Sequence, residues 1–386
     1  MKDKKRILIF STAYYPFVGG AEVSIKEITD ELGDFGFDLI TAKMKKDLPD
    51  VEKIGRVTVY RLGSGRPLLD RLLVPFRGAK KAWQLAAKNN YLCFWGVMVT
   101  YATGAAYMCN IYRNWLGKKK IPMVLSLQEG DSETHLRYRW GGLIHLSWKM
   151  ALKRTDYLTG LSTFLLHRAE MLGYDGLRAL VPNGVDIKFF SKPIGPKIRQ
   201  EIKKSLGKKD GDIFLVTTSR LVRKNATDDT IRALKLLPSN IRFIVIGKGP
   251  DWNKLHELAA TLGLAHRVTF LGFIEHKDFP RYLSACDMFI RPSRSEGFGV
   301  SFVEAMAAGL PVIATPIGGI PDFIDDKETG IFCSPDNPQS IAKAVELLMK
   351  DTLLREKIAE KGKYRVMERY SWEKIAQDMK AVFDTL

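Results

Sequence analysis

A chain of 386 residues is too long for one ordinary core and long enough for two domains. Its content of 46% hydrophobic and 27% charged residues excludes intrinsic disorder. The formal net charge of +17 favours an anionic partner. The cysteines lie far apart without metal-ligand spacing, which predicts buried thiols in a reducing, cytoplasmic compartment: Cys93, Cys109, Cys286 and Cys333.

The first half of the chain alternates short apolar runs with helical patterns. A strand is predicted over 6–11 and a helix over 21–32. Further buried strands are predicted over 39–42, 57–62, 91–99, 123–127, 157–161 and 178–181. The segment 89–112 has no charged side chain and is about long enough to span a bilayer. Its asparagines, threonines and glycines favour a buried strand followed by a helix instead.

The segment from Arg61 to Lys88 carries much of the positive charge. It holds seven basic residues against Asp70 alone, with leucines, Phe76 and Trp83 between them. Such a stretch can lie on an anionic membrane surface, at the inner face of the cell membrane. It is equally typical of a solvated helix and loop whose leucines dock on their own domain. Nucleic acid is disfavoured, because no binding motif accompanies the charge.

The second half repeats the alternation. Strands are predicted over 213–217, 241–246, 268–271, 288–291 and 312–314, and helices over 228–237, 254–262, 280–285 and 301–308. This pattern predicts the α/β class, with two Rossmann-like, doubly wound domains facing a central cleft. The predicted domains are residues 1–190 and 197–369, joined by a linker over 191–196.

The clearest chemical signal is the turn and helix that follow the strand over 288–291. Backbone amides of Gly299, Val300 and Ser301 at the helix start suit a diphosphate. Glu296, beside Gly297, can accept hydrogen bonds from sugar hydroxyls, and Glu304 from the hydroxyls of a ribose. The alternative for Glu304 is a capping box with Ser301, since the two are spaced as S-x-x-E.

Two further loops follow predicted strands. Arg220 and Lys224, four residues apart, can clamp a diphosphate and stabilise charge on a departing one, although such a pair alone is usually a solvated face. Arg223 between them is expected to point outward. Gly19 and Gly20 permit a tight turn beside a ligand. Asp210-Gly-Asp212 has the form of a metal-binding motif but is interpreted as a loop, so no metal site is predicted.

With these residues the chain resembles glycosyltransferase family 4, the retaining enzymes with the GT-B fold, also described as glycosyl transferases group 1. The resemblance covers nearly the whole chain and is most specific at the glutamate pair. It implies catalytic roles for Arg220, Lys224 and Glu296. The donor contacts that it implies are Gly19, Gly20, Gly247, Phe273, Gly297, Phe298, Gly299, Val300, Ser301 and Glu304. It also implies that a last helix, over 370–386, returns to the first domain.

One departure from the family concerns the acceptor side. Many members have a histidine where this chain has Gln128-Glu129-Gly130-Asp131. Gln128 can bind a sugar hydroxyl, and Glu129 or Asp131 is either a base or only shapes the loop. Asn183 is grouped with these acceptor or sugar contacts.

The sequence therefore predicts retaining transfer from a UDP- or GDP-linked sugar to a sugar or lipid-linked acceptor, without metal or cofactor. The alternatives are a nucleotide-sugar epimerase or other GT-B enzyme, and a basic module that binds anionic lipid or RNA.

Overall fold

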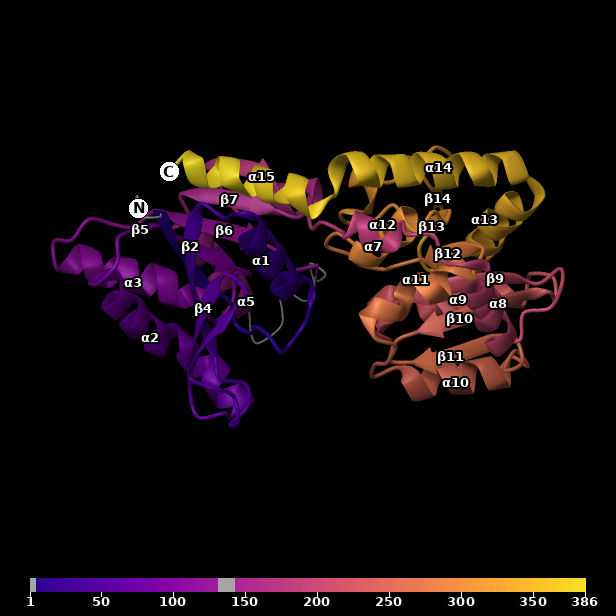
Figure 1. Cartoon of the computed structure of the whole chain (residues 1–386), viewed down its shortest axis with the longest axis horizontal. Coiled ribbons are helices and arrows are strands. Elements are labelled where there is room, and N and C mark those ends of the chain that lie inside the picture. The colour runs from indigo at the N-terminus through magenta and orange to yellow at the C-terminus, as the bar shows by residue number, and fades with distance from the viewer. Residues whose placement is uncertain (1–4, 131–142) are drawn as a thin grey trace. The chain divides into compact units, whose positions relative to one another are not determined.

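The computed structural model describes residues 5–130 and 143–386, and these form two compact units. Unit 1 comprises Met1–Gly184 and Trp372–Leu386, and unit 2 comprises Val185–Ser371 (Figure 1). The chain leaves unit 1 at Gly184 and returns to it at Trp372. Val185 donates its N–H to the carbonyl of Tyr370 at 2.8 Å, so the chain already belongs to unit 2 at that point. The predicted linker over 191–196 therefore lies inside unit 2.

The described residues of unit 1 build an eight-stranded sheet of order β3-β4-β2-β1-β5-β6-β7-β8. Only the β3–β4 pair is antiparallel, so the carboxyl ends of the other strands meet at one edge. The strands are β1 (Lys5–Phe10), β2 (Phe35–Ala42), β3 (Val51–Ile54), β4 (Val57–Leu62), β5 (Tyr91–Val97), β6 (Met123–Leu127), β7 (Tyr157–Gly160) and β8 (Leu177–Leu180).

Helices cover both faces of this sheet because its central strand is apolar on both sides. Ile7 and Ile9 of β1 pack in one core, and Leu8 and Phe10 pack in the other. Helices α1 and α15 cover the first face, and α2 and α3 cover the second (Figure 1). The helices that the structure describes in unit 1 are α1 (Gly20–Glu31), α2 (Pro67–Ala86), α3 (Thr103–Trp115), α5 (Leu143–Leu152), α6 (Thr163–Met171) and α15 (Trp372–Asp384).

Unit 2 contains a parallel six-stranded sheet of order β11-β10-β9-β12-β13-β14. The strands are β9 (Ile213–Thr218), β10 (Ile241–Ile246), β11 (Val268–Gly272), β12 (Met288–Arg291), β13 (Val312–Ala314) and β14 (Ile331–Phe332). The helices are α7 (Ile187–Phe190), α8 (Pro196–Ser205), α9 (Thr227–Leu234), α10 (Trp252–Thr261), α11 (Phe279–Ser284), α12 (Val300–Ala307), α13 (Pro338–Lys350) and α14 (Thr352–Arg369). Short 3₁₀ turns are η2 (Arg223–Asn225), η3 (His276–Asp278) and η4 (Ile320–Asp322).

Each sheet reverses its strand order at one point, and loops diverge there to leave a crevice for a ligand. In unit 1 the reversal lies between β1 and β5, and in unit 2 it lies between β9 and β12. The predicted α/β class with two Rossmann-like units is confirmed. The loops at these two reversal points follow β1, β5, β9 and β12.

The uncharged segment 89–112 forms the buried strand β5 and the start of helix α3, as predicted. In the part of the chain that the structure describes, no helix is both long and apolar enough to cross a bilayer. The four cysteines are free and buried, and burial raises the pKa of the Cys109 thiol to about 11.

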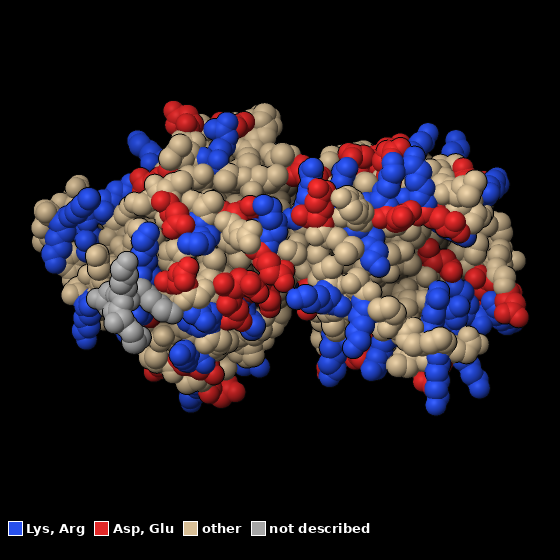
Figure 2. Space-filling model, turned by 45° about the horizontal axis from the view of Figure 1, so that its top comes forward, with Lys and Arg blue, Asp and Glu red and all other residues tan. Residues whose placement is uncertain are grey.

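The basic and acidic side chains are mixed on the surface. Figure 2 shows Lys and Arg interspersed with Asp and Glu on both units on the face in view. On that face, acidic side chains interrupt the positive excess.

Candidate active site

Helix α12 begins at a glycine that is required by backbone geometry. Gly299 is the residue before the first helical turn, and its φ is +105°. A Cβ there would also lie 2.7 Å from the ring of Phe302. The helix starts at Val300, so Ser301 lies within its first turn. The Ser301 hydroxyl accepts a hydrogen bond from Arg291 Nη1 at 2.7 Å. The capping-box alternative is therefore not the arrangement found here.

Glu296 lies in the turn between β12 and α12, with its carboxylate held in place. Oε2 accepts a hydrogen bond from Nη2 of Arg291, the last residue of β12. Oε1 accepts from the backbone N–H of Gly297 at 3.0 Å and of Phe298 at 3.4 Å. Burial lowers the pKa of Arg291, although the charges of nearby glutamates raise it. Glu296 is thus a fixed carboxylate beside the amino end of α12.

Glu304 is buried one turn into α12 and pairs with a residue from another loop. Its Oε1 lies 2.7 Å from Nε2 of His276, which follows β11. The hydrogen bond to Glu304 raises the pKa of His276 above its ordinary value of 6.5. The rings of Phe189, Phe190 and Phe279 lie around the imidazole. These contacts fix the orientation of the Glu304 carboxylate.

The loop after β9 carries the two predicted cations. Arg220 is exposed and Lys224 is half-buried, and neither side chain forms an ion pair with any described residue. The side-chain amide of Asn225 donates to the carbonyl of Arg220 at 2.7 Å, which closes the loop. The backbone N–H of Arg294 donates to the carbonyl of Lys224 at 2.7 Å. The loops after β9 and β12 are therefore bound together at the point of strand reversal.

Arg294 also locks these two loops to helix α9. Its guanidinium donates to Asp228 at 2.9 and 3.1 Å, and it pairs with Asp229 and Asp336. Burial raises the pKa of Asp228, but hydrogen bonds from Arg294 and Arg232 outweigh it and leave that pKa below its usual value. This network gives the cation-bearing loop a rigid support.

Several polar atoms at the carboxyl ends of β9 and β12 are buried and unsatisfied. Thr217 Oγ1, Ser219 Oγ, Arg291 Nε and Ser293 Oγ have no hydrogen-bond partner among the residues described. Buried polar groups are normally paired, so a cluster of exceptions calls for an explanation. These four exceptions lie at the reversal point in unit 2.

The loop after β10 closes against the loop after β9. Gly247 has a φ of +136°, and a Cβ there would lie 1.9 Å from the carbonyl oxygen of Ser219. Its N–H donates to the carbonyl of Gly272 at 2.7 Å. Gly247 is thus required by backbone packing. Phe273, after β11, is 74% exposed and therefore accessible to a ligand.

Phe298, one of the predicted donor contacts, has its side chain in the core. The residue is 2% exposed, and its ring packs against Phe323 and Tyr370 at 5.4 and 5.7 Å between centroids. An aromatic ring next to a glycine can stack on a ligand, but the ring of Phe298 faces the core. Only the backbone of Phe298 remains available.

The predicted residues of unit 1 lie at the start of α1 and near the end of the unit. Gly19 has an extended backbone, and a Cβ at Gly20 would make only ordinary contact with Asn183, at 3.5 Å. The packing of the protein itself therefore does not demand glycine at Gly20. The amide oxygen of Asn183 is buried and has no partner within the described ranges.

The loop after β6 is shaped by a buried glutamate. Glu129 accepts hydrogen bonds from the N–H of Val99, after β5, and from the N–H of Gln128 at 3.1 Å. These two hydrogen bonds support the role of Glu129 in shaping the loop. Gln128 is half-buried at the same edge. Asp131 lies outside the described residues.

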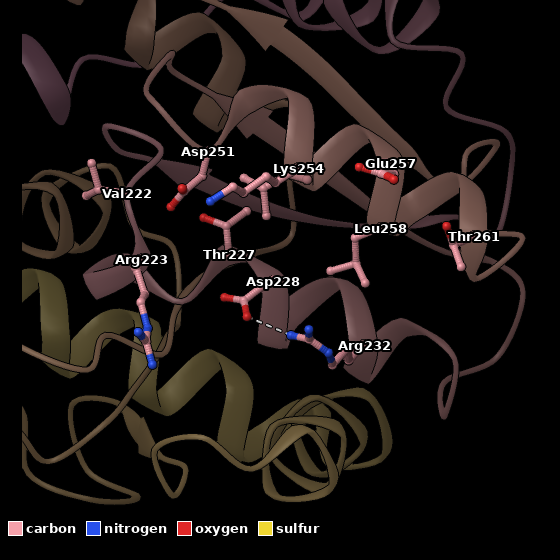
Figure 3. Close-up of a pocket in the computed structure, with 11 residues that line it drawn as sticks. Val222, Arg223, Thr227, Asp228, Arg232, Asp251, Lys254, Glu257, Leu258 and Thr261 are labelled. Carbon is pink, nitrogen blue, oxygen red and sulfur yellow. Dashed lines mark hydrogen bonds and ion pairs between the residues drawn. The ribbon is translucent and has the colours of Figure 1, made fainter.

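Arg223 lines a separate cavity of about 430 Å³ between α9 and α10. In Figure 3 its side chain extends away from Asp251 and Lys254, while Asp228 faces Arg232. Arg223 is exposed, which agrees with the expectation that its side chain points outward. The motif Asp210-Gly-Asp212 precedes β9 and so lies at the amino edge of the sheet, opposite the reversal-point loops. The described residues contain no group of three or more His, Cys, Asp and Glu arranged to hold a metal ion.

Sequence reasoning missed three residues of this site: His276, Arg291 and Arg294. Arg291 and Arg294 lie in the same segment as Glu296. Their position as charged residues at the end of a buried strand could have indicated a role in the site. His276 had no comparable signal, because its partner Glu304 is 28 residues away.

The chain is similar in sequence and in fold to known glycosyltransferases. The profile of the family described as glycosyl transferases group 1 matches residues 198–365. The chain is 32% identical to the lipopolysaccharide core biosynthesis mannosyltransferase LpsB of Rhizobium meliloti, over 59% of this chain and 69% of that protein. Sucrose-phosphate synthase from Thermosynechococcus elongatus shares the fold, with a TM-score of 0.82 at 20% identity over 99% of each chain.

A further solved structure is HepE of Anabaena in complex with UDP-glucose. Its TM-score is 0.77 at 22% identity, over 99% of this chain and 100% of that one. At these identities, the likeness to the two solved structures concerns the fold. The LpsB match and the family profile concern the sequence itself, and the profile spans the loops that carry Arg220, Lys224, Glu296 and Glu304. The chain belongs to the glycosyl transferases group 1 family and is a glycosyltransferase.

Proposed function

We propose that this glycosyltransferase moves a glycosyl unit from a nucleotide sugar to an acceptor hydroxyl with retention of the α configuration. The observation that carries the proposal is the meeting of two fixed carboxylates and two cations, which have no ion pair among the residues described, at the reversal point of unit 2. Arg220 and Lys224 suit a diphosphate, and Glu296 and Glu304 suit hydroxyl groups. Together they match the parts of a nucleotide sugar.

Each donor part has a candidate partner. The diphosphate binds Arg220, Lys224 and the amides of Gly299, Val300 and Ser301 at the start of α12. Glu304 accepts from the ribose hydroxyls, and the exposed ring of Phe273 lies beside the base. Glu296 accepts from hydroxyls of the transferred sugar.

In the reaction, the acceptor oxygen forms a bond to the anomeric carbon on the face from which the phosphate departs. The bond from that carbon to the phosphate oxygen breaks, and the acceptor proton passes to the departing diphosphate. Arg220, Lys224 and the helix amides stabilise the negative charge that grows on the diphosphate. We propose that these fixed positive groups carry this charge without a bound metal or other cofactor.

The relatives support a nucleotide-linked donor but leave its base open. HepE is described in complex with UDP-glucose, and LpsB is described as a mannosyltransferase. A panel of UDP- and GDP-linked sugars, with and without sugar acceptors, tests the proposal. Release of nucleoside diphosphate that depends on an acceptor supports transfer. Epimerised nucleotide sugar without release would instead indicate an epimerase.

A second part of the proposal concerns a membrane surface, and it rests on helix α2. Leu68, Leu72 and Phe76 recur every four residues and are 68%, 43% and 61% exposed. They therefore do not dock on their own domain. Arg66, the residue before this helix, and Arg71 within it are exposed. An exposed apolar row with adjacent cations suits an anionic bilayer, so we propose that α2 docks there and brings the enzyme to lipid-linked acceptors.

A further inference from the structure

Unit 1 contains a basic cavity of about 460 Å³ between the β3–β4 hairpin and helix α2. Leu62 and the residues that follow β4 form one wall, and Arg77, Lys80 and Lys81 form another. Because β4 runs parallel to β2 and β1, the cavity lies at the carboxyl edge of the sheet. Ligands of open α/β sheets bind at that edge.

Two of the cations that line this cavity are unpaired. Within the residues described, neither Lys80 nor Lys81 forms an ion pair. The Lys81 ammonium lies 4.3 Å from the ring centre of Tyr60, so its stem is held against the cavity wall. Asp50 is the carboxylate among the lining residues, and it already pairs with Lys43 at 2.7 Å. The cavity is therefore positive in sum.

Of the other two lining cations, Arg61 pairs with Glu52 at 2.7 Å, and Arg77 is held by a buried carboxylate. Asp70 is fully buried and accepts hydrogen bonds from the backbone N–H groups of Ser64, Gly65 and Arg66 at 2.8–2.9 Å. Its other oxygen lies 3.1 Å from Nη1 of Arg77. The remaining N–H groups of Arg77 are free to donate elsewhere. Asp70 thus ties the turn after β4 to α2 and fixes one wall of the cavity.

We propose that this cavity binds a phosphate group, presented either by a soluble acceptor or by a phospholipid headgroup. Arg77 supplies directed donors to the phosphate oxygens, and Lys80 and Lys81 supply charge. The Ser64 hydroxyl, exposed at the rim, adds a further donor. The inference rests on the proposed function in one respect: it assigns the phosphate to the acceptor or to the membrane that carries the acceptor. Binding itself is testable without any nucleotide sugar.

The test uses full-length protein in which Arg220→Ala and Lys224→Ala remove the diphosphate cations of unit 2. In this background, Lys80→Gln/Lys81→Gln is compared with Lys118→Gln/Lys119→Gln, an exposed adjacent pair elsewhere in unit 1. Calorimetry measures binding of glycerol 1-phosphate, and flotation measures binding to phosphatidylcholine vesicles with and without phosphatidylglycerol. Lys80→Glu alone, at an exposed position, serves as a second variant.

The Lys80/Lys81 variant is expected to weaken phosphate binding at least about tenfold, while the Lys118/Lys119 variant binds as its parent does. Lys80→Glu alone is also expected to weaken phosphate binding relative to its parent, because it replaces a positive charge with a negative one. If the Lys80/Lys81 variant binds glycerol 1-phosphate more weakly, a soluble phosphate is sufficient for binding in the cavity. If only its binding to phosphatidylglycerol vesicles is weaker, the ligand is a phospholipid headgroup. Equal binding by the two lysine-pair variants in both measurements would overturn the inference, whatever the transfer activity.

Discussion

Arg291 joins Glu296 to the start of helix α12, because it donates to the Glu296 carboxylate through Nη2 and to the Ser301 hydroxyl through Nη1 at 2.7 Å. The Arg291 guanidinium also lies 4.4 Å from the ring centre of Phe302. A single buried cation therefore fixes both the carboxylate that we propose binds the sugar and the helix end that we propose binds the diphosphate. Contacts within the protein thus hold the turn in place, and such preorganisation favours catalysis.

The Glu296 carboxylate has two separable roles. Glu296→Gln keeps an oxygen that can accept from Arg291 but removes the charge, and turnover is expected to fall about ten- to a hundredfold. Glu296→Ala leaves the buried Arg291 unpaired, so it is expected to lower stability as well, by about 3 kcal/mol. Steady-state kinetics and urea unfolding of both variants separate the roles. Unchanged turnover in both would refute the catalytic assignment.

The His276–Glu304 pair predicts a pH-dependent contribution to stability. The pKa of His276 is raised in the folded state, mainly by its hydrogen bond to Glu304 and further by the charge of Asp186. The stabilisation is therefore complete below the unfolded pKa of about 6.5 and is lost as pH rises through the folded pKa. His276→Gln should lower the melting temperature more at about pH 6 than at about pH 9. An equal loss at both values would contradict the charged pair.

Activity is expected to persist in excess chelator. In this account the diphosphate is held by Arg220, Lys224 and the amides of α12, so no divalent ion is needed for its charge. Turnover measured with EDTA, with magnesium and with manganese should agree. Asp210→Asn/Asp212→Asn is the matching variant, and it should leave turnover unchanged. Loss of activity on chelation, restored by a metal ion, would require a metal site.

Membrane docking through α2 depends on its exposed apolar row. Leu68→Gln/Phe76→Gln should release the protein from vesicles that contain phosphatidylglycerol, because both side chains lose their favourable transfer into the bilayer. Leu353→Gln, at a residue of α14 that is 81% exposed, is the control and should bind as wild type does. Raised salt should also release the wild type by screening. A wild type that fails to sediment with these vesicles at low salt would end this proposal.

The buried parallel strands were predictable because each is a short, continuous apolar run. The bounds of β4, β6, β10, β12 and β13 are those read from the sequence. Strand β3 was missed, because it is an edge strand of only four residues, antiparallel and partly exposed. For the segment that forms helix α2, a membrane-binding stretch and a solvated helix and loop with docked leucines were both left open. The exposure of the leucines depends on which face of α2 packs against α3.

The predictable part of the site was the part that is local in the chain. Glu296, the glycine turn and Glu304 follow one strand, so their order alone places them at a helix start. The partners of these residues come from elsewhere: His276 pairs with Glu304 across 28 residues, and Arg294 pairs with Asp228 across 66. Such contacts arise from the order of strands in the sheet, which a single sequence does not encode in any local pattern.

The central claim is that the reversal point of unit 2 binds the diphosphate of a nucleotide sugar through Arg220 and Lys224. The most direct measurement is calorimetric titration of UDP and GDP into the wild type, Arg220→Ala/Lys224→Ala and the control Arg223→Ala. Since charged hydrogen bonds contribute about 1.5–3 kcal/mol each, the double variant should bind the preferred nucleotide at least about a hundredfold more weakly. Arg223→Ala should bind as wild type does. Wild-type affinity in the double variant would contradict the claim.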